Sequence, residues 1–377
     1  MRFLHCSDLH LGRKLYEFDL LEDQRHILNQ LIEIAVSEKA DAVLVAGDVY
    51  DKGLPSLDAV NLLDDFLTTL SRKKLPVYLI SGNHDSADRL AYGGRLFEGS
   101  GIHLASSFEG RAKSYCLEDE YGPLYLWSLP FVRPSAVRNA LPEKEISNYT
   151  DAVAALVEQM QLHSDCRNLL MAHQFVTCGE KNPITSDSET VCLGTLDNVD
   201  TSALAPFDYV ALGHIHSPQQ VGRPTIRYCG SPLAYSVTES TRPNTATLVD
   251  MGPKGQVDIT EIPLSPLRAV RGIEGQLEQL LLSGSPSSDY VYATLTDETP
   301  PLDGMSRLRV MYPNLVRLEF KLPKAAQQPV AGPELAKIAR LSPAQLFRDF
   351  YQKVHGREMS EQEVKMLNGA LDEEEKR

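Results

Sequence analysis

The fold is decided by the stretch Ala42-Val43-Leu44-Val45-Ala46-Gly47-Asp48, in which an apolar run ends in a glycine and a carboxylate. The same pattern occurs earlier in Phe3-Leu4-His5-Cys6-Ser7-Asp8 and later in Pro76-Val77-Tyr78-Leu79-Ile80-Ser81-Gly82-Asn83-His84. Short apolar runs bounded by turn residues are typical of buried strands. The sequence therefore predicts three strands that each end in polar side chains.

Amphipathic segments separate these predicted strands. The first ends near Lys39, and the second runs from Leu57 to Leu70 with Val60, Leu63 and Leu67 on one face. The apolar positions of the first segment are Leu20, Ile27, Leu28, Leu31, Ile32 and Ala35. Because apolar strands alternate with helices of this kind, we expect parallel strands in βαβ units.

Shorter β-rich runs after Ile102 predict a two-layered or sandwiched sheet. They span residues 113–117, 124–129, 168–172, 209–212, 225–229, 246–250 and 257–262. A helix between residues 151 and 162 carries Val153, Leu156, Val157 and Met160 on one side, and we expect it to cover one face of the sheets. The predicted fold class is α/β, with sandwiched sheets flanked by helices.

Prolines and polar residues divide the rest of the chain. Pro263 and Pro266 mark a boundary, and residues 267–320 then have the pattern β-α-β-α-β of a small α+β domain. A linker follows at residues 323–329. Ser342-Pro343-Ala344-Gln345 and Ser360-Glu361-Gln362-Glu363 each start a helix with a capping signal. We expect domains at residues 1–264 and 265–324, followed by a linker and helices at 325–377.

The composition is that of an ordinary globular protein, with 42% hydrophobic and 23% charged residues. A net charge of −14 argues against a broad basic surface, but bound metal ions can still create a local anion site. The six cysteines form no C-x-x-C pair, and the first residues lack the apolar stretch of a signal peptide. We therefore expect a cytoplasmic protein with reduced thiols.

Five predicted strand ends carry side chains that can bind metal ions. Singly, each has an ordinary explanation: Asp48 as a helix cap, Asn83 in an Asx turn, His173 as a hydrogen-bonded structural histidine. Packing alone does not require ligand-type side chains at five strand ends, so these residues together indicate a metal site. The candidate ligands are Asp8, His10, Asp48, Asn83, His173, His214 and His216. They suit two divalent ions sharing a carboxylate, manganese first, with iron, magnesium or zinc as alternatives.

The ordered motifs resemble those of the calcineurin-like metallophosphoesterases. That family has D-x-H, G-D, G-N-H-D or G-N-H-E, a lone histidine and G-H-x-H, and every element is present here in order. More narrowly, Ala211-Leu212-Gly213-His214-Ile215-His216 and Tyr228-Cys229-Gly230-Ser231-Pro232 resemble the SbcD-like nucleases. The resemblance implies a four-layer β-sandwich flanked by helices, a small α+β capping domain and C-terminal helices.

The resemblance also implies roles for individual residues. Asp8, His10 and His216 would hold one metal ion, Asn83, His173 and His214 the other, and Asp48 would bridge them. His84 would stabilise the transition state or protonate the leaving group, with Asp85 orienting it. One departure is Leu9, where some relatives carry tryptophan, and this change touches packing and not ligation.

The activity implied by the resemblance is that of a metal-dependent DNA nuclease in DNA repair, recombination and replication. It would be a 3′-to-5′ exonuclease on duplex ends and an endonuclease on single strands and hairpins. The capping domain would contact DNA, and the tail from Leu341 to Phe347 would bind the SbcC ATPase. The chain would act in the cytoplasm at the nucleoid, as a homodimer within a heterotetramer. The segments Leu57 to Leu70 and Leu90 to Phe97 are possible dimer contacts.

Two other functions remain open from the sequence. The same ligands would serve a phosphatase or a cyclic-nucleotide phosphodiesterase, although neither has an evident need for a capping domain and paired tail helices. A scaffold that binds DNA ends with a vestigial site is the third possibility, and the intact ligand set argues against it.

Overall fold

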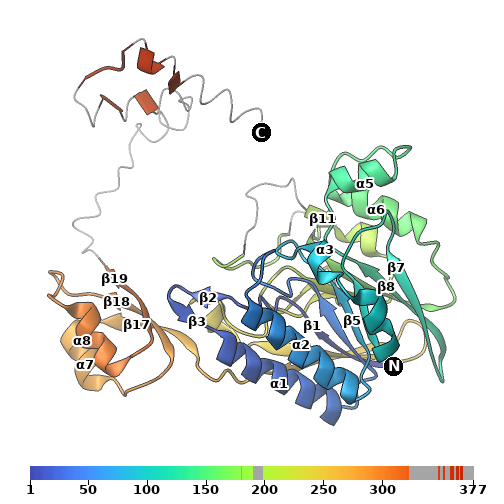
Figure 1. The fold of residues 1–377 in the computed structure, drawn as a ribbon, viewed down its shortest axis with the longest axis horizontal. Coiled ribbons are helices and arrows are strands. Elements are labelled where there is room, and N and C mark those ends of the chain that lie inside the picture. The colour runs from blue at the N-terminus through green and yellow to red at the C-terminus, as the bar shows by residue number, and fades with distance from the viewer. Residues whose placement is uncertain are drawn as a thin grey trace. The chain divides into compact units, whose positions relative to one another are not determined.

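The computed structural model describes residues 1–179, 181–189 and 198–321, together with short pieces between residues 347 and 367. The chain divides into two compact units, Met1–Thr294 with Leu302–Glu319, and Leu295–Pro301 with Phe320–Arg377 (Figure 1). Across the described residues, no helix has the length and apolar character needed to cross a membrane.

The first sheet has six strands in the order β16-β15-β1-β4-β5-β6. Their bounds are β16 Val257–Pro263, β15 Thr245–Met251, β1 Arg2–Cys6, β4 Ala42–Ala46, β5 Val77–Ile80 and β6 Ile102–Ala105. Strands β1, β4, β5 and β6 run parallel, and helices α1 (Leu21–Ser37) and α2 (Leu57–Arg72) connect the first three. The predicted βαβ units are therefore confirmed.

The buried face of α2 differs from the predicted one. Val60 is 39% exposed, whereas Leu63 is buried. The buried positions are Ala59, Leu62, Leu63, Phe66 and Leu70. This stripe also has helical spacing. It starts at Ala59, one residue before Val60, so two apolar series with the same spacing overlap in this helix. Leu57 and Val60 are consequently left on the surface.

The second sheet also has six strands, in the order β13-β14-β12-β9-β8-β7. Their bounds are β13 Gln219–Val221, β14 Arg223–Tyr228, β12 Tyr209–Gly213, β9 Arg167–His173, β8 Gly122–Leu129 and β7 Lys113–Asp119. The four central strands run parallel, and an antiparallel strand closes each edge. Helices α5 (Pro134–Ala140) and α6 (Tyr149–Gln159) belong to this half, and the predicted apolar face of α6 is buried.

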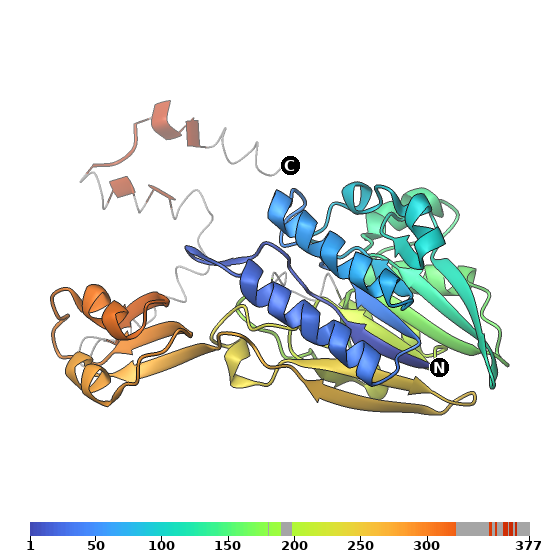
Figure 2. The ribbon, with the colours of Figure 1, turned by 60° about the horizontal axis from the view of Figure 1, so that its bottom comes forward.

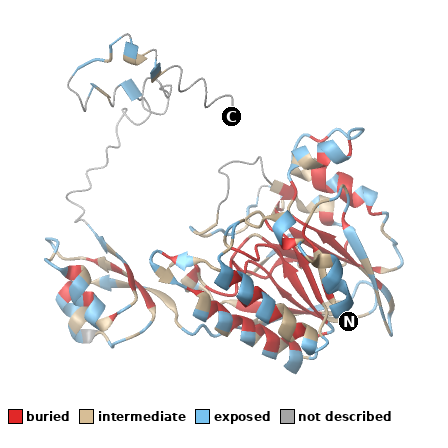
Figure 3. Cartoon of the chain, viewed as in Figure 1, coloured by how far each residue is buried: buried red, intermediate tan, exposed pale blue. Residues whose placement is uncertain are grey.

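The two sheets pack face to face between two layers of helices. One apolar cluster lies between the sheets and includes Phe3, Leu44, Leu169 and Tyr209. A second cluster joins α1 and α2 to the first sheet, and a third joins α5 and α6 to the second sheet (Figure 2). Figure 3 shows that buried residues concentrate on the central strands. The four-layer sandwich predicted from the resemblance is confirmed.

A separate three-stranded sheet follows the sandwich, in the order β17-β18-β19. It contains β17 (Val270–Gly275), α7 (Leu277–Ser283), β18 (Tyr290–Leu295), α8 (Gly304–Met311) and β19 (Leu315–Phe320), as predicted. Its start is tied to α1, because Arg268 Nη1 and the Tyr290 hydroxyl each lie 2.8 Å from Oδ2 of the buried Asp23. The predicted boundary at residue 264 precedes this tie.

The tail confirms one of two predicted capping boxes. The Ser360 amide donates to the Glu363 carboxylate at 2.7 Å, and the Glu363 amide donates to Ser360 Oγ at 3.4 Å. These reciprocal bonds satisfy two amide groups at a helix start. The other predicted start, Ser342-Pro343-Ala344-Gln345, lies outside the described residues, as does the segment from Leu341 to Leu346.

Candidate metal centre

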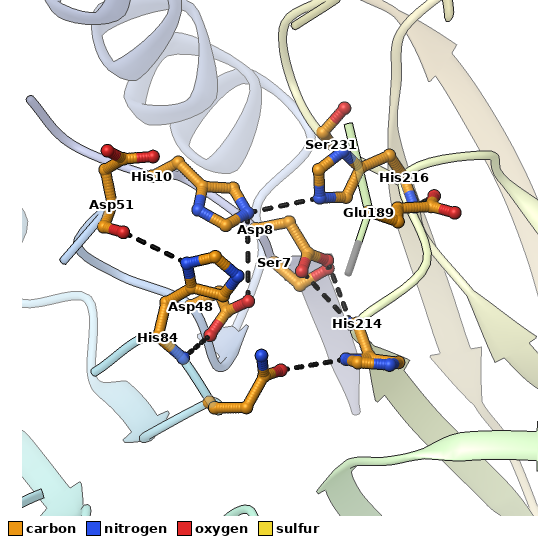
Figure 4. A network of polar contacts seen from close by, with 12 residues as sticks. Ser7, Asp8, His10, Asp48, Asp51, His84, Glu189, His214, His216 and Ser231 are labelled. Carbon is orange, nitrogen blue, oxygen red and sulfur yellow. Dashed lines mark hydrogen bonds and ion pairs between the residues drawn. The ribbon is translucent and has the colours of Figure 1, made fainter. Parts of the chain in front are cut away.

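The strand ends of both sheets meet at one edge of the sandwich. The chain leaving β1 carries Asp8 and His10, β4 leads to Asp48, and β5 leads to Asn83. From the second sheet, β9 ends at His173 and β12 leads to His214 and His216. Figure 4 shows most of these side chains pointing toward one another from different strands. The structure therefore brings the predicted ligands together across both sheets.

Four of these residues have an unusual backbone. Positive φ angles occur at Asp8 (53°), His10 (42°), Asp48 (48°) and His214 (101°). Residues with a side chain rarely adopt this region, and such strain is concentrated at functional sites. Asp8 and His10 both lie beyond β1, which ends at Cys6, so left-handed turns and not strand alternation aim their side chains.

Close packing at this edge requires two glycines. A Cβ atom on Gly82 would overlap the side chain and backbone of Asp48. Gly47 has φ 91°, and a Cβ atom there would overlap the ring of His173. These glycines let the loops after β4 and β5 approach each other.

Contacts link the ligand side chains into one cluster. His10 Nε2 lies 3.1 Å from His216 Nε2 and 3.7 Å from Asp48 Oδ2. Asp48 Oδ2 lies 3.4 Å from His173 Nε2. The Asn83 oxygen lies 3.1 Å from His173 Nε2 and 2.9 Å from His214 Nδ1.

Asp8 joins this cluster through two further groups. The amide of His214 donates to both Asp8 carboxylate oxygens, at 3.1 and 3.2 Å. The Asp8 carboxylate also accepts from the hydroxyl of Ser7, its neighbour in the chain. Asp8 therefore ties the loop after β1 to the loop after β12.

The hydrogen bonding of His173 shows that this cluster suits a cation. Its Nδ1 donates to the Ala46 carbonyl at 2.8 Å, so its Nε2 in the neutral ring is an acceptor. That nitrogen nevertheless faces two other acceptors, the Asn83 oxygen and the Asp48 carboxylate. Such an arrangement needs either a second proton or a metal ion, and imidazole, carboxylate and amide donors fit a divalent metal ion.

The electrostatics agree with this requirement. Burial lowers the pKa of His173, but the Asp48 carboxylate outweighs it and raises that pKa to about 9. Burial raises the pKa of Asp48, yet the surrounding imidazoles, His173 first, bring it well below its usual value. Burial lowers the pKa of His214 to about 3, so that ring stays neutral. Asp48 and His214 thus already have the protonation states that metal binding needs, whereas His173 would release a proton from Nε2 when a metal ion binds.

His84 lies at the mouth of the cluster. Its ring centroid is 4.9 Å from that of His10, and its amide donates to Asp48 Oδ1 at 2.9 Å. His84 Nδ1 donates to the Asp51 carbonyl at 3.0 Å, which leaves Nε2 free for another partner. The ring is partly exposed and lines a pocket of about 410 Å³ together with Arg13, Lys14, Lys52 and Ser188.

Asp85 does not contact the His84 ring, contrary to the predicted orienting role. Its carboxylate accepts from the backbone amides of Val49, Tyr50 and Gly82 at 2.9–3.0 Å. Burial, and then the nearby Asp48 carboxylate, raise the pKa of Asp85 to about 6. Asp85 thus fastens the loop after β4 to the loop after β5, and the Asp51 carbonyl orients His84.

Sequence reasoning missed a group of residues around His216. Glu239 Oε1 lies 2.9 Å from His216 Nδ1, and Ser188 Oγ lies at the same distance from that nitrogen. Glu189 accepts from the His216 amide at 2.6 Å. A carboxylate on one imidazole nitrogen directs the lone pair of the other toward a metal ion. Glu239 lies in an ordinary polar stretch, so no spacing signal could have identified it.

Comparisons with known proteins identify two regions of this chain. Residues 1–218 match the calcineurin-like phosphoesterase family, which covers the predicted ligand residues. Residues 263–355 match the family described as the type 5 capsule protein repressor C-terminal domain. A solved dimetal phosphatase from Danio rerio is 13% identical, with a TM-score of 0.44, over 70% of this chain and 96% of that chain.

Two curated relatives are similar over most of the chain. The D subunit of the nuclease SbcCD from Staphylococcus epidermidis is 34% identical over 84% of this chain and 85% of its own length. The protein of the same name from Staphylococcus saprophyticus is 30% identical over 97% of this chain and 96% of its own length. With the family match over residues 1–218, these similarities show that the chain belongs to the calcineurin-like phosphoesterases, within the family of SbcD nucleases.

Proposed function

We propose that this chain is a metal-dependent DNA nuclease that processes DNA ends and hairpins with an SMC-like ATPase, SbcC. The observation that carries the proposal is the convergence of acceptor groups around His173 and Asp48 within a phosphoesterase fold, which suits a divalent metal ion. Membership of the SbcD nuclease family supports DNA as the substrate. Exonuclease action from 3′ to 5′ on duplex ends and endonuclease action on single strands remain predictions of this proposal.

We propose two sets of ligands, one on each side of Asp48. Asp8, His10 and His216 offer ligand atoms within 4.8 Å of one another and would hold one ion. Asn83, His173 and His214, which share contacts through the Asn83 oxygen, would hold the other. Asp48 faces both groups and would bridge them. Bound ions would supply a hydroxide-like nucleophile and neutralise charge on the phosphate, and manganese is our first choice.

His84 has the geometry of a proton donor to the leaving oxygen. Its Nδ1 is fixed on the Asp51 carbonyl, so the proton that it would donate is the one on Nε2, and the residue lines the pocket. Arg13, Lys14 and Lys52 line the same pocket and would hold the phosphates of the DNA strand by charge. A positioned histidine commonly contributes about 10²- to 10⁴-fold to proton transfer.

Two surfaces support the proposed assembly. Leu57 is 74% exposed near the start of α2, and Tyr92 and Leu96 are 85% and 82% exposed in the segment that follows β5. Exposed apolar residues of this size suit the proposed dimer contact. In the tail, Phe347 and Met366 are also exposed, and we propose that the tail helices bind the ATPase.

Three further parts of the proposal concern the domains, the DNA contact and the location of the protein. We propose a nuclease domain at residues 1–264, a capping domain at 265–324 that contacts DNA, and an ATPase-binding tail at 325–377. The match of residues 263–355 to a separate family supports a division near residue 264. A DNA substrate would place the protein in the cytoplasm at the nucleoid.

Cleavage of an end-labelled hairpin duplex tests the proposal. The reaction would contain manganese, with and without the cognate ATPase and ATP. We expect manganese-dependent opening of the hairpin that the ATPase and ATP stimulate. Faster turnover of mononucleotides or cyclic nucleotides than of DNA would instead support the phosphatase or cyclic-nucleotide alternative. Absence of any cleavage with the ATPase present would support a binding scaffold.

A further inference from the structure

A second cavity adjoins the metal centre. It has a volume of about 510 Å³, and we call it the tyrosine groove after Tyr16 and Tyr292. Tyr16 lies in the turn between the short strands β2 (Lys14–Leu15) and β3 (Phe18–Asp19), and Tyr292 lies on β18. Arg13 and Ser188 line both this groove and the pocket that contains His84. The groove therefore borders the pocket that contains His84.

The aromatic rings of the groove are available for stacking. Tyr16 is 57% exposed, and its ring meets that of Tyr292 edge to face, with centroids 6.4 Å apart and an interplanar angle of 68°. Because the two rings do not stack on each other, a planar ligand can stack on a ring face. Exposed tyrosine faces in a groove are typical platforms for nucleobases.

The charges of the groove favour a base over a phosphate. Arg317 and Glu319 form an ion pair at 2.8 Å. The groove is also lined by Arg13, which is positively charged, and by Asp187, which is negatively charged. These charges balance, unlike the cationic pocket with Arg13, Lys14 and Lys52. A phosphate would gain little from a balanced groove. A nucleobase carries both donors and acceptors on its edge, which an arginine and a glutamate can match.

We propose that the tyrosine groove binds one unpaired nucleobase of the substrate strand next to the cleaved phosphate, with Tyr16 as the stacking platform and Arg317 and Glu319 at the base edge. A base inside a duplex has its faces covered by neighbouring bases and its edge engaged in pairing, so the groove selects an unstacked and unpaired nucleotide. Arg317 Nη1 lies 3.1 Å from the Tyr16 hydroxyl and holds that ring in place. This inference rests on the proposed function, because it names the feature of DNA that the metal centre meets.

The experiment measures KM for manganese-dependent cleavage of a single-stranded oligonucleotide and of the same strand carrying abasic positions. Stacking on tyrosine is strong enough that Tyr16→Ala should raise KM for the normal strand about 5- to 100-fold. The abasic strand should raise KM for the wild-type chain by a similar factor. Tyr16→Ala acting on the abasic strand should have a KM close to that of either change alone, because both changes remove the same stacking contact.

Matched variants separate stacking from general damage. Tyr121→Ala removes another exposed tyrosine, in the turn between β7 and β8, and should stay within about twofold of the wild-type KM. Tyr16→Phe retains the ring and loses only the hydrogen bond from Arg317, so it should raise KM less than Tyr16→Ala does. Arg317→Ala, on a different element, should raise KM less than Tyr16→Ala does. It also provides a second test if Tyr16→Ala does not fold.

Different failures would have different meanings. Hydrolysis of bis(p-nitrophenyl) phosphate, a diester without a nucleobase, reports the metal centre alone. A wild-type chain that hydrolyses this compound but cuts no DNA would overturn the proposed function. A chain that cuts DNA with an unchanged KM in Tyr16→Ala and Arg317→Ala would overturn the tyrosine groove only. If Tyr16→Ala raised KM for a fully paired duplex as much as for the single strand, the proposed selectivity for unpaired bases would be overturned.

Discussion

The two ends of strand β9 carry buried polar groups of opposite character. Arg167, at its start, is 2% exposed and donates to the Asp119 carboxylate at 3.0 Å and to the Met251 carbonyl at 3.1 Å. His173, at its end, is fully buried, but its Nε2 faces the acceptors of Asp48 and Asn83. The acceptors at one end meet a charged side chain of the protein, while those at the other end converge where a second proton or a metal ion would lie. Acceptors that converge on a buried imidazole are therefore the mark of the site.

Removing Asp48 should have the largest effect at the His173 end of β9. Asp48→Ala takes away the acceptor shared by both proposed metal ions, so we expect more than 100-fold weaker manganese binding, beyond the loss typical of residues behind the ligands. Titration calorimetry measures the affinity directly. Chelation should also lower the melting temperature of the wild-type chain, because bound ligands stabilise the folded state, and should leave Asp48→Ala unchanged. Equal responses to chelator would contradict the bridging role.

His84→Ala should separate metal binding from cleavage. The ring is near the cluster but its imidazole contacts only the Asp51 carbonyl and the ring of His10 among the described residues. We expect a loss of about 10²- to 10⁴-fold in hairpin cleavage. Manganese affinity should stay close to that of the wild type. Cleavage at the normal rate would remove His84 from the mechanism.

Asp119→Asn tests the matched end of β9. Hydrogen bonds from Arg167 hold the pKa of Asp119 well below its usual value, so its stabilising contribution is complete above pH ~3.9 and is lost as the pH falls toward the folded-state pKa. At pH 7 the variant leaves Arg167 uncompensated, and we expect a loss of about 3–5 kcal/mol in the free energy of unfolding. Urea unfolding should show this difference shrinking below pH ~4. Manganese affinity serves as the control and should not change.

Glu239→Gln should have the smallest effect, and it acts from behind a ligand. It removes the charge that faces His216 Nδ1, and such partners typically contribute about 10- to 100-fold to metal affinity. Glu189→Gln is the matched control, because Glu189 contacts the His216 backbone and not its ring. A larger loss of manganese affinity in the control than in Glu239→Gln would contradict this positioning role.

The sequence predicted most of the fold because its signals are local. Apolar runs closed by G-D and G-N-H located β4 and β5, and the apolar positions of α1 matched its buried face. In α2 the prediction chose Val60, because two overlapping stripes satisfy the same spacing and only the packing of the whole sheet decides between them. The local sequence pattern therefore predicts the type of element more reliably than it predicts which face of that element is buried.

The candidate site was predictable in its ligand residues but not in their support. Strand ends signal ligands because parallel strands deliver them to one edge. The left-handed turns at Asp8 and His214, and the approach of Glu239 to His216, depend on contacts between distant segments. Asp85 shows the same limit, since a neighbour in sequence to His84 proved to bind the backbone of another loop.

The division of the ligands between two sheets has a consequence for protein synthesis. The first sheet supplies ligands from Asp8 to Asn83, but it is completed only by β15 and β16, which end at Pro263. A growing chain on the ribosome thus carries the proposed ligands of the first sheet before those of the second sheet exist. The proposed centre can form only after both sets of strands have been synthesised, so the order of translation sets the earliest point at which metal ions could bind.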